Sequence, residues 1–442
     1  MSSPLSSPNQ PLVKLFYTVK SYCSRFLNPA SAAIYVAINA VSLFITYKRL
    51  SSDLGIELFG TWSLFLTFNV SFGLFLTGFN GSVIKFLPEK ILTESRLVFT
   101  FLTTSIWSVL LVTVTVLLLI YLFLSHFIVS IVASSLHFTL VFDAMPVIFS
   151  FILLTNISTV FLSILEGFNK SYVKHIILSV QALAIVIQVL AFNTPIKFLT
   201  TAWIFFVSSI FTFFLGIVCV VIVTRIRFCD ILNFDIKSLR STWNYHTHYF
   251  LGNVFGLLQE PINKLLIVHF VGAGAAGVYE MASKFVLQAR TVLVSAILAL
   301  VPKIAKMYIE TPNQIPSYYT KLFRLNIYIS TITFTILGFS LPQLSNIWFG
   351  HIDQMFINMG LVLVVGWYVN NLCLPAYAMN VATRGIQKNT IASLITIIMN
   401  LFVALLLNAL NLGEYIIYAW VIAIAVGGLF LILVQRVDKQ ES

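Results

Sequence analysis

Five ionisable side chains stand inside two long apolar runs near the middle of the chain. Between residues 253 and 306 the sequence places Glu260, Lys264, Glu280, Lys284 and Arg290 among leucine, valine, isoleucine and alanine. If these runs cross a lipid bilayer, each lone charge costs about 2.5–3.5 kcal/mol, so such charges pair with one another or face a watery path. They predict either a polar cavity for a charged ligand or a set of structural ion pairs.

Helical spacing gathers these charges into two polar stripes. In the first run the stripe consists of Asn253, Gly256, Glu260, Asn263 and Lys264. In the second run it consists of Glu280, Lys284, Gln288, Thr291 and Ser295. Each stripe contains a glutamate followed four residues later by a lysine, which is the favourable order for a pair within one helix.

A glycine-rich turn between the two runs would bring Lys264 level with Glu280 and Lys284, whereas Arg290 lies deeper and about a third of a turn from its stripe. Three basic and two acidic residues leave a charge of +1, which suits an anionic ligand better than a cation. We therefore predict a substrate-binding cavity, and the alternative is intrahelical pairing that only holds helices together. The predicted cavity residues are Lys264, Lys284, Arg290, Glu260, Glu280, Gln288 and Asn263.

Pro261 stands in the middle of the first stripe. A proline inside a helix removes a backbone hydrogen bond and kinks the helix. It predicts a hinge for alternating access, with an ordinary membrane-helix proline as the equal alternative.

Composition identifies the class of protein that carries these stripes. Of the 442 residues, 59% are hydrophobic and only 9% are charged, with a mean hydropathy of +0.96. Soluble chains carry about 25% charged residues, so we predict an integral membrane protein. The sequence contains no block of basic residues of the kind that binds nucleic acid, and the spacing of the four cysteines does not fit a metal site. We therefore expect no nucleic acid, metal or cofactor.

The apolar runs are long enough for twelve membrane-spanning helices, since one span needs about 20 residues. We expect them near 29–47, 58–82, 97–124, 141–165, 173–193, 198–224, 245–270, 275–303, 320–341, 354–378, 389–411 and 413–435. Loops on one side hold 20 of the 26 basic residues, and the opposite loops hold three. The positive-inside rule then predicts that both termini are cytoplasmic.

The chain also repeats itself, with one match at an offset of 217 residues and another at 218. LGIELFGTW, from Leu54 to Trp62, aligns without gaps on VGAGAAGVY, from Val271 to Tyr279, and GFNKS at 167–171 matches GIQKN at 385–389. This predicts two parallel six-helix lobes around a central cavity in an all-α polytopic membrane protein. We divide the chain into an N-terminal interfacial helix (1–28), an N-terminal lobe (29–224), a cytoplasmic inter-lobe linker (225–244), a C-terminal lobe (245–435) and a cytoplasmic tail (436–442).

Two segments carry a family resemblance. FGTWSLFLTFNVSFGLFLTGFNGSVIKFLPEK, from Phe59 to Lys90, and NKLLIVHFVGAGAAGVYEMASKF, from Asn263 to Phe285, resemble Wzx-type polysaccharide or O-antigen repeat-unit flippases of the MATE-like superfamily. The resemblance implies a multi-pass protein of the bacterial inner (plasma) membrane. It implies that the chain moves an undecaprenyl-pyrophosphate-linked oligosaccharide, with membrane lipids and possible polymerase and glycosyltransferase partners. The first span departs from some relatives because it holds no basic residue between positions 30 and 46.

Two other functions compete with this expectation. An ion-coupled MATE-type multidrug exporter would share the fold, but such a site usually needs carboxylates in the first half, where Asp143 is the candidate. A membrane enzyme such as a polymerase needs catalytic residues in a large outer loop. We find short outer loops and no nucleophile or paired-carboxylate signature, so we expect no catalytic residues and no enzyme activity.

Overall fold

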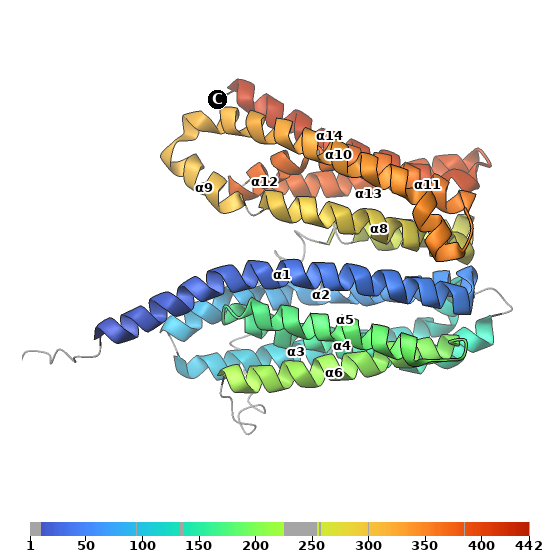
Figure 1. The fold of residues 1–442 in the computed structure, drawn as a ribbon, viewed down its shortest axis with the longest axis horizontal. Helices are drawn as coiled ribbons and strands as arrows, with labels where there is room; N and C mark the ends of the chain where they lie inside the picture. The colour runs from blue at the N-terminus through green and yellow to red at the C-terminus, as the bar shows by residue number, and fades with distance from the viewer. Residues whose placement is uncertain are drawn as a thin grey trace, which may run out of the picture.

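The computed structural model describes residues 10–93, 95–132, 137–224, 254–255, 258–298, 300–383 and 385–441, and within these ranges every regular element is a helix. Figure 1 shows two bundles of long, roughly parallel helices stacked one on the other. The first bundle, the N-lobe, contains α1 (Gln10–Leu54), α2 (Ile56–Thr93), α3 (Ser95–Val132), α4 (Phe138–Gly167), α5 (Ser171–Ala191) and α6 (Phe198–Thr224).

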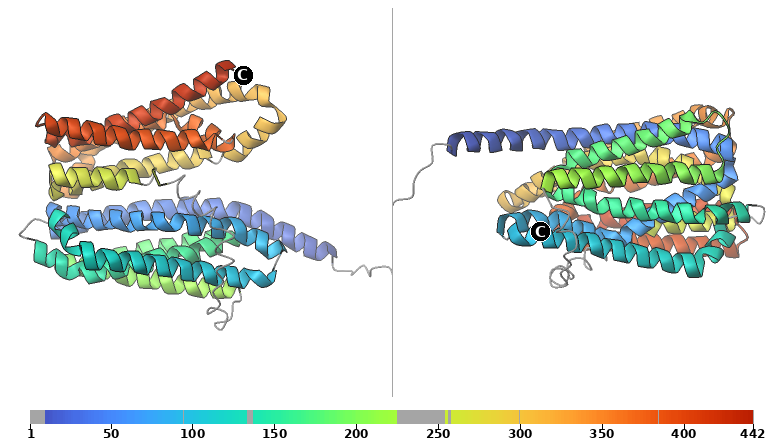
Figure 2. Two further views of the ribbon diagram at one scale, coloured as in Figure 1. Left: turned by 180° about the vertical axis from the view of Figure 1, so that it is seen from behind. Right: turned by 90° about the horizontal axis from the view of Figure 1, so that it is seen from below.

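The second bundle, the C-lobe, begins with a helical segment at 258–270. It continues with α8 (Ala273–Leu298), α9 (Val301–Glu310), α10 (Ile315–Phe349), α11 (Gln354–Asn371), α12 (Leu374–Ala382), α13 (Ile386–Ala409) and α14 (Ile416–Glu441). The left view in Figure 2 shows the same division into lobes from behind, and in the right view, from below, the two lobes overlap.

Nine of the described helices are long and apolar enough to cross a membrane, and the bent pair α11–α12 makes a tenth candidate. The bend of 40° falls where Pro375 opens α12. The second and seventh predicted spans correspond to α2 and to the segment 258–270. The arrangement confirms the all-α fold with two six-span lobes.

Two predicted boundaries fall inside continuous helices. α1 is one unbroken helix from Gln10 to Leu54, so no break separates the predicted surface helix at 1–28 from the first span. α14 likewise continues through the predicted tail to Glu441. The predicted linker at 225–244 and the start of the seventh span lie outside the described residues, and so do Asn253 and Gly256 of the first stripe.

The internal repeat has a direct structural meaning. Gly55 separates α1 from α2 with φ of +77°, and its counterpart Gly272 precedes α8 with φ of +110°, a backbone region that favours glycine. The second pair of matched glycines, Gly60 and Gly277, lies where α2 and α8 cross. A Cβ atom on Gly60 would collide with the carbonyl of Ala273, and one on Gly277 would collide with the carbonyl of Ile56. The backbones of the two lobes therefore approach each other closely at equivalent positions of the repeat.

Aromatic packing fixes the inner face of the N-lobe. Trp62 on α2 is fully buried, and its ring lies 4.9 Å from that of Phe205 on α6 and 6.4 Å from that of Phe151 on α4. Large buried rings have few alternative rotamers, so they hold three helices at a fixed spacing. The surface that they support forms one wall of the cavity described next.

Candidate functional site

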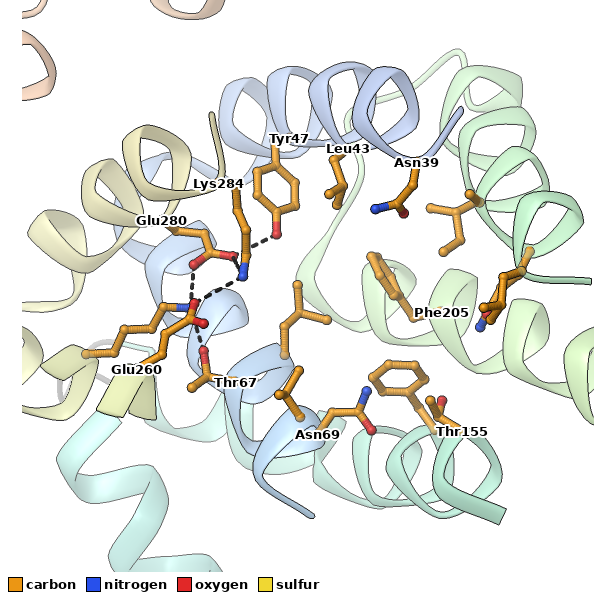
Figure 3. A pocket seen from close by; sticks show the side chains of 18 of the residues that line it. Asn39, Leu43, Tyr47, Thr67, Asn69, Thr155, Phe205, Glu260, Glu280 and Lys284 are labelled. Atoms are coloured by element: carbon orange, nitrogen blue, oxygen red, sulfur yellow. Dashed lines mark hydrogen bonds and ion pairs between the residues drawn. The ribbon is translucent and has the colours of Figure 1, made fainter. Parts of the chain in front are cut away.

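Four of the five predicted charges meet at the boundary between the lobes. Glu260 and Lys264 come from the segment 258–270, and Glu280 and Lys284 come from α8; we call them the ion-pair tetrad (Figure 3). Lys284 Nζ lies 3.0 Å from Glu260 Oε1 and 3.8 Å from Glu280 Oε1. Lys264 Nζ lies 3.5 Å from Glu260 Oε1 and pairs closely with Glu280. Each lysine thus shares both glutamates, and the tetrad is neutral overall.

The tetrad has a buried half and a half-exposed half. The Lys264 and Glu280 side chains are 1% and 0% exposed, whereas Glu260 and Lys284 are 32% and 28% exposed. The buried half is also bonded to the N-lobe. Tyr47 of α1 donates a hydrogen bond to Glu280 Oε1 at 2.8 Å, and Lys264 donates one to Thr67 Oγ1 of α2. These bonds connect the two lobes directly.

The tetrad forms one wall of a cavity of about 440 Å³, which we call the N-lobe cavity. The other walls come from five N-lobe helices and carry amides, hydroxyls and aromatic rings. The sequence leaves a ligand cavity and structural ion pairs as alternatives, and the tetrad has features of both. Its members pair with one another, and the pairs line a cavity. The residues of the N-lobe that face this cavity include Tyr35, Asn39, Asn69, Phe151, Thr155, Gln181 and Phe205.

Sequence reasoning missed this amide-rich wall. It searched the first half for basic and acidic residues and found none inside the first span. Asn39 and Gln181 were the available signal, because an amide in the middle of an apolar span needs a polar environment. Both residues line the same cavity because of how α1 and α5 pack together. That packing cannot be read from the sequence of either helix alone.

Arg290 lies apart from the tetrad, in a second cavity of about 400 Å³ within the C-lobe. Its guanidinium lies 4.4 Å from the ring centre of Trp367 and donates a hydrogen bond to Asn370 Oδ1 at 3.2 Å. The walls of this C-lobe cavity also include Gln259, Tyr377, Asn389, Ser393 and Thr396. The sequence predicts all three cations in one cavity, whereas Lys264 and Lys284 line the N-lobe cavity and Arg290 lines the C-lobe cavity.

Among the described residues lining the C-lobe cavity, none is acidic. The Arg290 Nε atom is buried and has no hydrogen-bond partner in the described part of the chain. A guanidinium in such a place favours an anionic ligand, because a buried charge without a counterion is costly. Its donors match the paired oxygens of a phosphate.

The remaining predicted residues take other positions. Gln288 lies in an apolar cleft of about 320 Å³ between α1, α8 and α10, which Lys284 also lines. Asn263 is fully buried and lines neither of the two polar cavities. Pro261 lines the N-lobe cavity and lies in the first turn of the segment 258–270, so the predicted kink before it falls on residues that are not fully described.

A model of the family described as "Polysaccharide biosynthesis protein" matches residues 27–308 of the chain. Comparison with curated proteins by sequence gave no match.

Solved structures share the fold over nearly the whole chain. An inward-facing multidrug resistance MATE-family transporter of the MOP superfamily has a TM-score of 0.78 at 14% identity, covering 92% of this chain and 98% of that one. Lipid II flippase MurJ in an inward closed conformation has a TM-score of 0.74 at 17% identity, covering 93% and 87%. A MOP superfamily transporter from Pyrococcus furiosus has a TM-score of 0.63 at 12% identity, covering 94% of both chains.

Proposed function

The chain belongs to the polysaccharide biosynthesis protein family, and on that basis we propose that it is a lipid-linked oligosaccharide flippase. Its substrate is an undecaprenyl-pyrophosphate-linked repeat unit for surface polysaccharide, either O-antigen or capsule. The protein carries this unit from the cytoplasmic to the outer leaflet of the bacterial inner membrane. Both termini are cytoplasmic in this proposal, and polymerase and glycosyltransferase enzymes are its partners.

The observation that carries the proposal is the charge of the C-lobe cavity. Arg290 is held by a neutral amide and an aromatic face, so its positive charge is left for a ligand. A pyrophosphate is doubly anionic and cannot enter hydrocarbon without a counterion. The guanidinium offsets that cost while the polyprenyl tail stays in the bilayer.

Movement between the leaflets follows from the two-lobe architecture. The lobes meet at the glycine crossing and at the tetrad, and they enclose separate polar cavities on either side. Rocking of one lobe against the other would expose these cavities to each leaflet in turn, with Pro261 as the hinge of the seventh span. No covalent chemistry is needed for this transfer, so we propose a transporter and no enzyme.

An ion-coupled multidrug exporter is the alternative with the same fold. Glu260 and Glu280 do bring carboxylates to the N-lobe cavity, where such an exporter would need them. Both are neutralised by Lys264 and Lys284, however, so this cavity has no net negative charge to attract a cationic drug. The uncompensated charge of the described cavities is positive, which favours the anionic lipid.

Surface polysaccharide measured in a strain that depends on this protein tests the proposal. Arg290→Ala removes the guanidinium, and losing one charge-assisted contact should lower export about tenfold to a hundredfold. Arg290→Lys keeps the charge and should restore part of the export. Arg324→Ala is the matched control, because Arg324 is an exposed arginine of α10 that lines neither polar cavity. Unchanged export by Arg290→Ala at normal protein level would contradict the proposal.

A further inference from the structure

We propose that the N-lobe cavity is a saccharide site that selects uncharged sugar rings. This inference rests on the proposed function and assigns a separate part of the substrate to each lobe. The pyrophosphate belongs to the C-lobe cavity with Arg290, and the sugar nearest to it belongs to the N-lobe cavity.

The charge of the N-lobe cavity excludes an anion as its preferred ligand. Its acidic and basic lining residues are the four members of the tetrad, and each of them is already paired. An anionic group entering this cavity would have to compete with Glu260 and Glu280 for the two lysines. Because like charges repel strongly in a weakly polarisable interior, that competition is unfavourable.

Amide side chains supply the hydrogen bonds that a sugar needs. Asn39 of α1 and Asn69 of α2 reach the cavity from different helices (Figure 3), and Gln181 lines it from α5. Asn39 and Gln181 form no side-chain hydrogen bond with any described residue. Each amide offers both donors and acceptors, which matches the hydroxyl groups of a sugar.

Aromatic rings supply the second half of saccharide recognition. Phe151 and Phe205 line the cavity, and Figure 3 shows Phe205 across it from the tetrad. Their rings meet edge to face at 5.7 Å. Trp62 packs behind both of them, so the rings are held rigidly. The apolar C–H face of a sugar can stack on such a surface while its hydroxyls reach the amides. Aromatic walls with a few placed polar groups are typical of small-molecule sites of about 300–1,000 Å³.

The two cavities lie close enough to hold parts of one molecule. Gln259 lines the C-lobe cavity, and its neighbour Glu260 lines the N-lobe cavity. On α8, Lys284 and Arg290 are about 9 Å apart along the helix axis. That separation matches the distance from a pyrophosphate to the first or second sugar attached to it.

Equilibrium binding to the full-length protein in lipid nanodiscs tests the assignment. The three probes are undecaprenyl pyrophosphate, the same carrier with one N-acetylhexosamine, and the same carrier with one hexuronic acid. We expect the uncharged sugar to raise affinity about tenfold over the bare carrier, and the uronic acid to add nothing.

The variants Asn39→Leu and Gln181→Met should each lower the affinity for the carrier with the uncharged sugar by about threefold to tenfold. The affinity for the bare carrier should stay unchanged. Neither change breaks a bond within the described structure, so folding should be preserved. Asn408→Leu, at an exposed position of α13, is the matched control and should bind like the wild type.

The outcomes separate this inference from the proposed function. An unchanged sugar gain in both variants, or equal gains from the uncharged sugar and the uronic acid, would overturn the saccharide site alone. Failure of the wild type to bind even the bare carrier would instead overturn the anion site at Arg290 and the proposed function with it.

Discussion

The Lys264–Glu280 ion pair is the most deeply buried part of the tetrad, and Glu280→Gln is the sharpest test of its role. The substitution keeps the side-chain shape and an oxygen that can accept the hydrogen bond from Tyr47. It removes the charge that faces Lys264, which is 1% exposed. Lys264 is then left with Glu260 at 3.5 Å, a carboxylate that it shares with Lys284.

The expected cost follows from this geometry. Breaking a buried pair by removing one partner destabilises a protein by about 3–5 kcal/mol. Because Glu260 still compensates part of the lysine charge, we expect a value near the lower end, about 3 kcal/mol. The matched control is Glu310→Gln, since Glu310 pairs with Lys306 at 3.7 Å with both side chains more than half exposed. That change should cost at most about 1 kcal/mol.

Reversible unfolding of the purified protein in mixed micelles measures both values. The double variant Lys264→Met/Glu280→Gln removes both charges, so it should be less destabilised than the sum of the two single variants by more than about 1 kcal/mol. If Glu280→Gln costs no more than Glu310→Gln, or if the double variant is simply additive, the buried pair does not stabilise the contact between lobes as argued.

Three further changes test the helix crossing and the anion site. Gly60→Ala should lower the free energy of unfolding by about 1–3 kcal/mol, because its Cβ meets backbone of α8. Gly338→Ala, whose Cβ has only ordinary contacts, should be neutral or stabilising in the same unfolding assay in mixed micelles. Gly272→Ala has open space around its Cβ but a φ of +110°, so calorimetry should show a backbone cost of about 1–3 kcal/mol. Trp367→Leu removes the ring over Arg290 and should weaken binding of undecaprenyl pyrophosphate about threefold to tenfold.

The fold could be predicted from sequence because its determinants are local. Apolar runs long enough to cross a bilayer define the spans. Where the backbone requires a glycine, that glycine can be read directly in the sequence. Gly55 and Gly272 are matched by alignment alone, and the structure gives both a positive φ. Gly60 and Gly277 are matched in the same way, and they form the crossing of α2 and α8. The repeat was visible because a positive φ favours glycine at the first pair and a close backbone contact excludes a side chain at the second.

The site could be predicted only in part, because helical periodicity fixes directions within one helix and not between helices. The pairs Glu260–Lys264 and Glu280–Lys284 follow from spacing, but the bond from Lys284 to Glu260 depends on how two helices face each other. Arg290 follows Lys284 by six residues, about 240° around the helix. This offset predicts that the two point differently, but the position of α11 and α14 decides which cavity Arg290 meets.

The tetrad and Arg290 lie at different distances from the glycine crossing, and this difference separates their roles in the proposed transport. Glu280 lies three residues after Gly277, about 4.5 Å along α8, whereas Arg290 lies about 20 Å away. If the lobes rock about the glycine crossing, each atom moves in proportion to its distance from that crossing. In that proposed motion the tetrad would move little, and its bonds to Tyr47 and Thr67 could persist through the cycle. Arg290 would move further, and in the proposed flippase this is the residue that accompanies the anionic headgroup between leaflets.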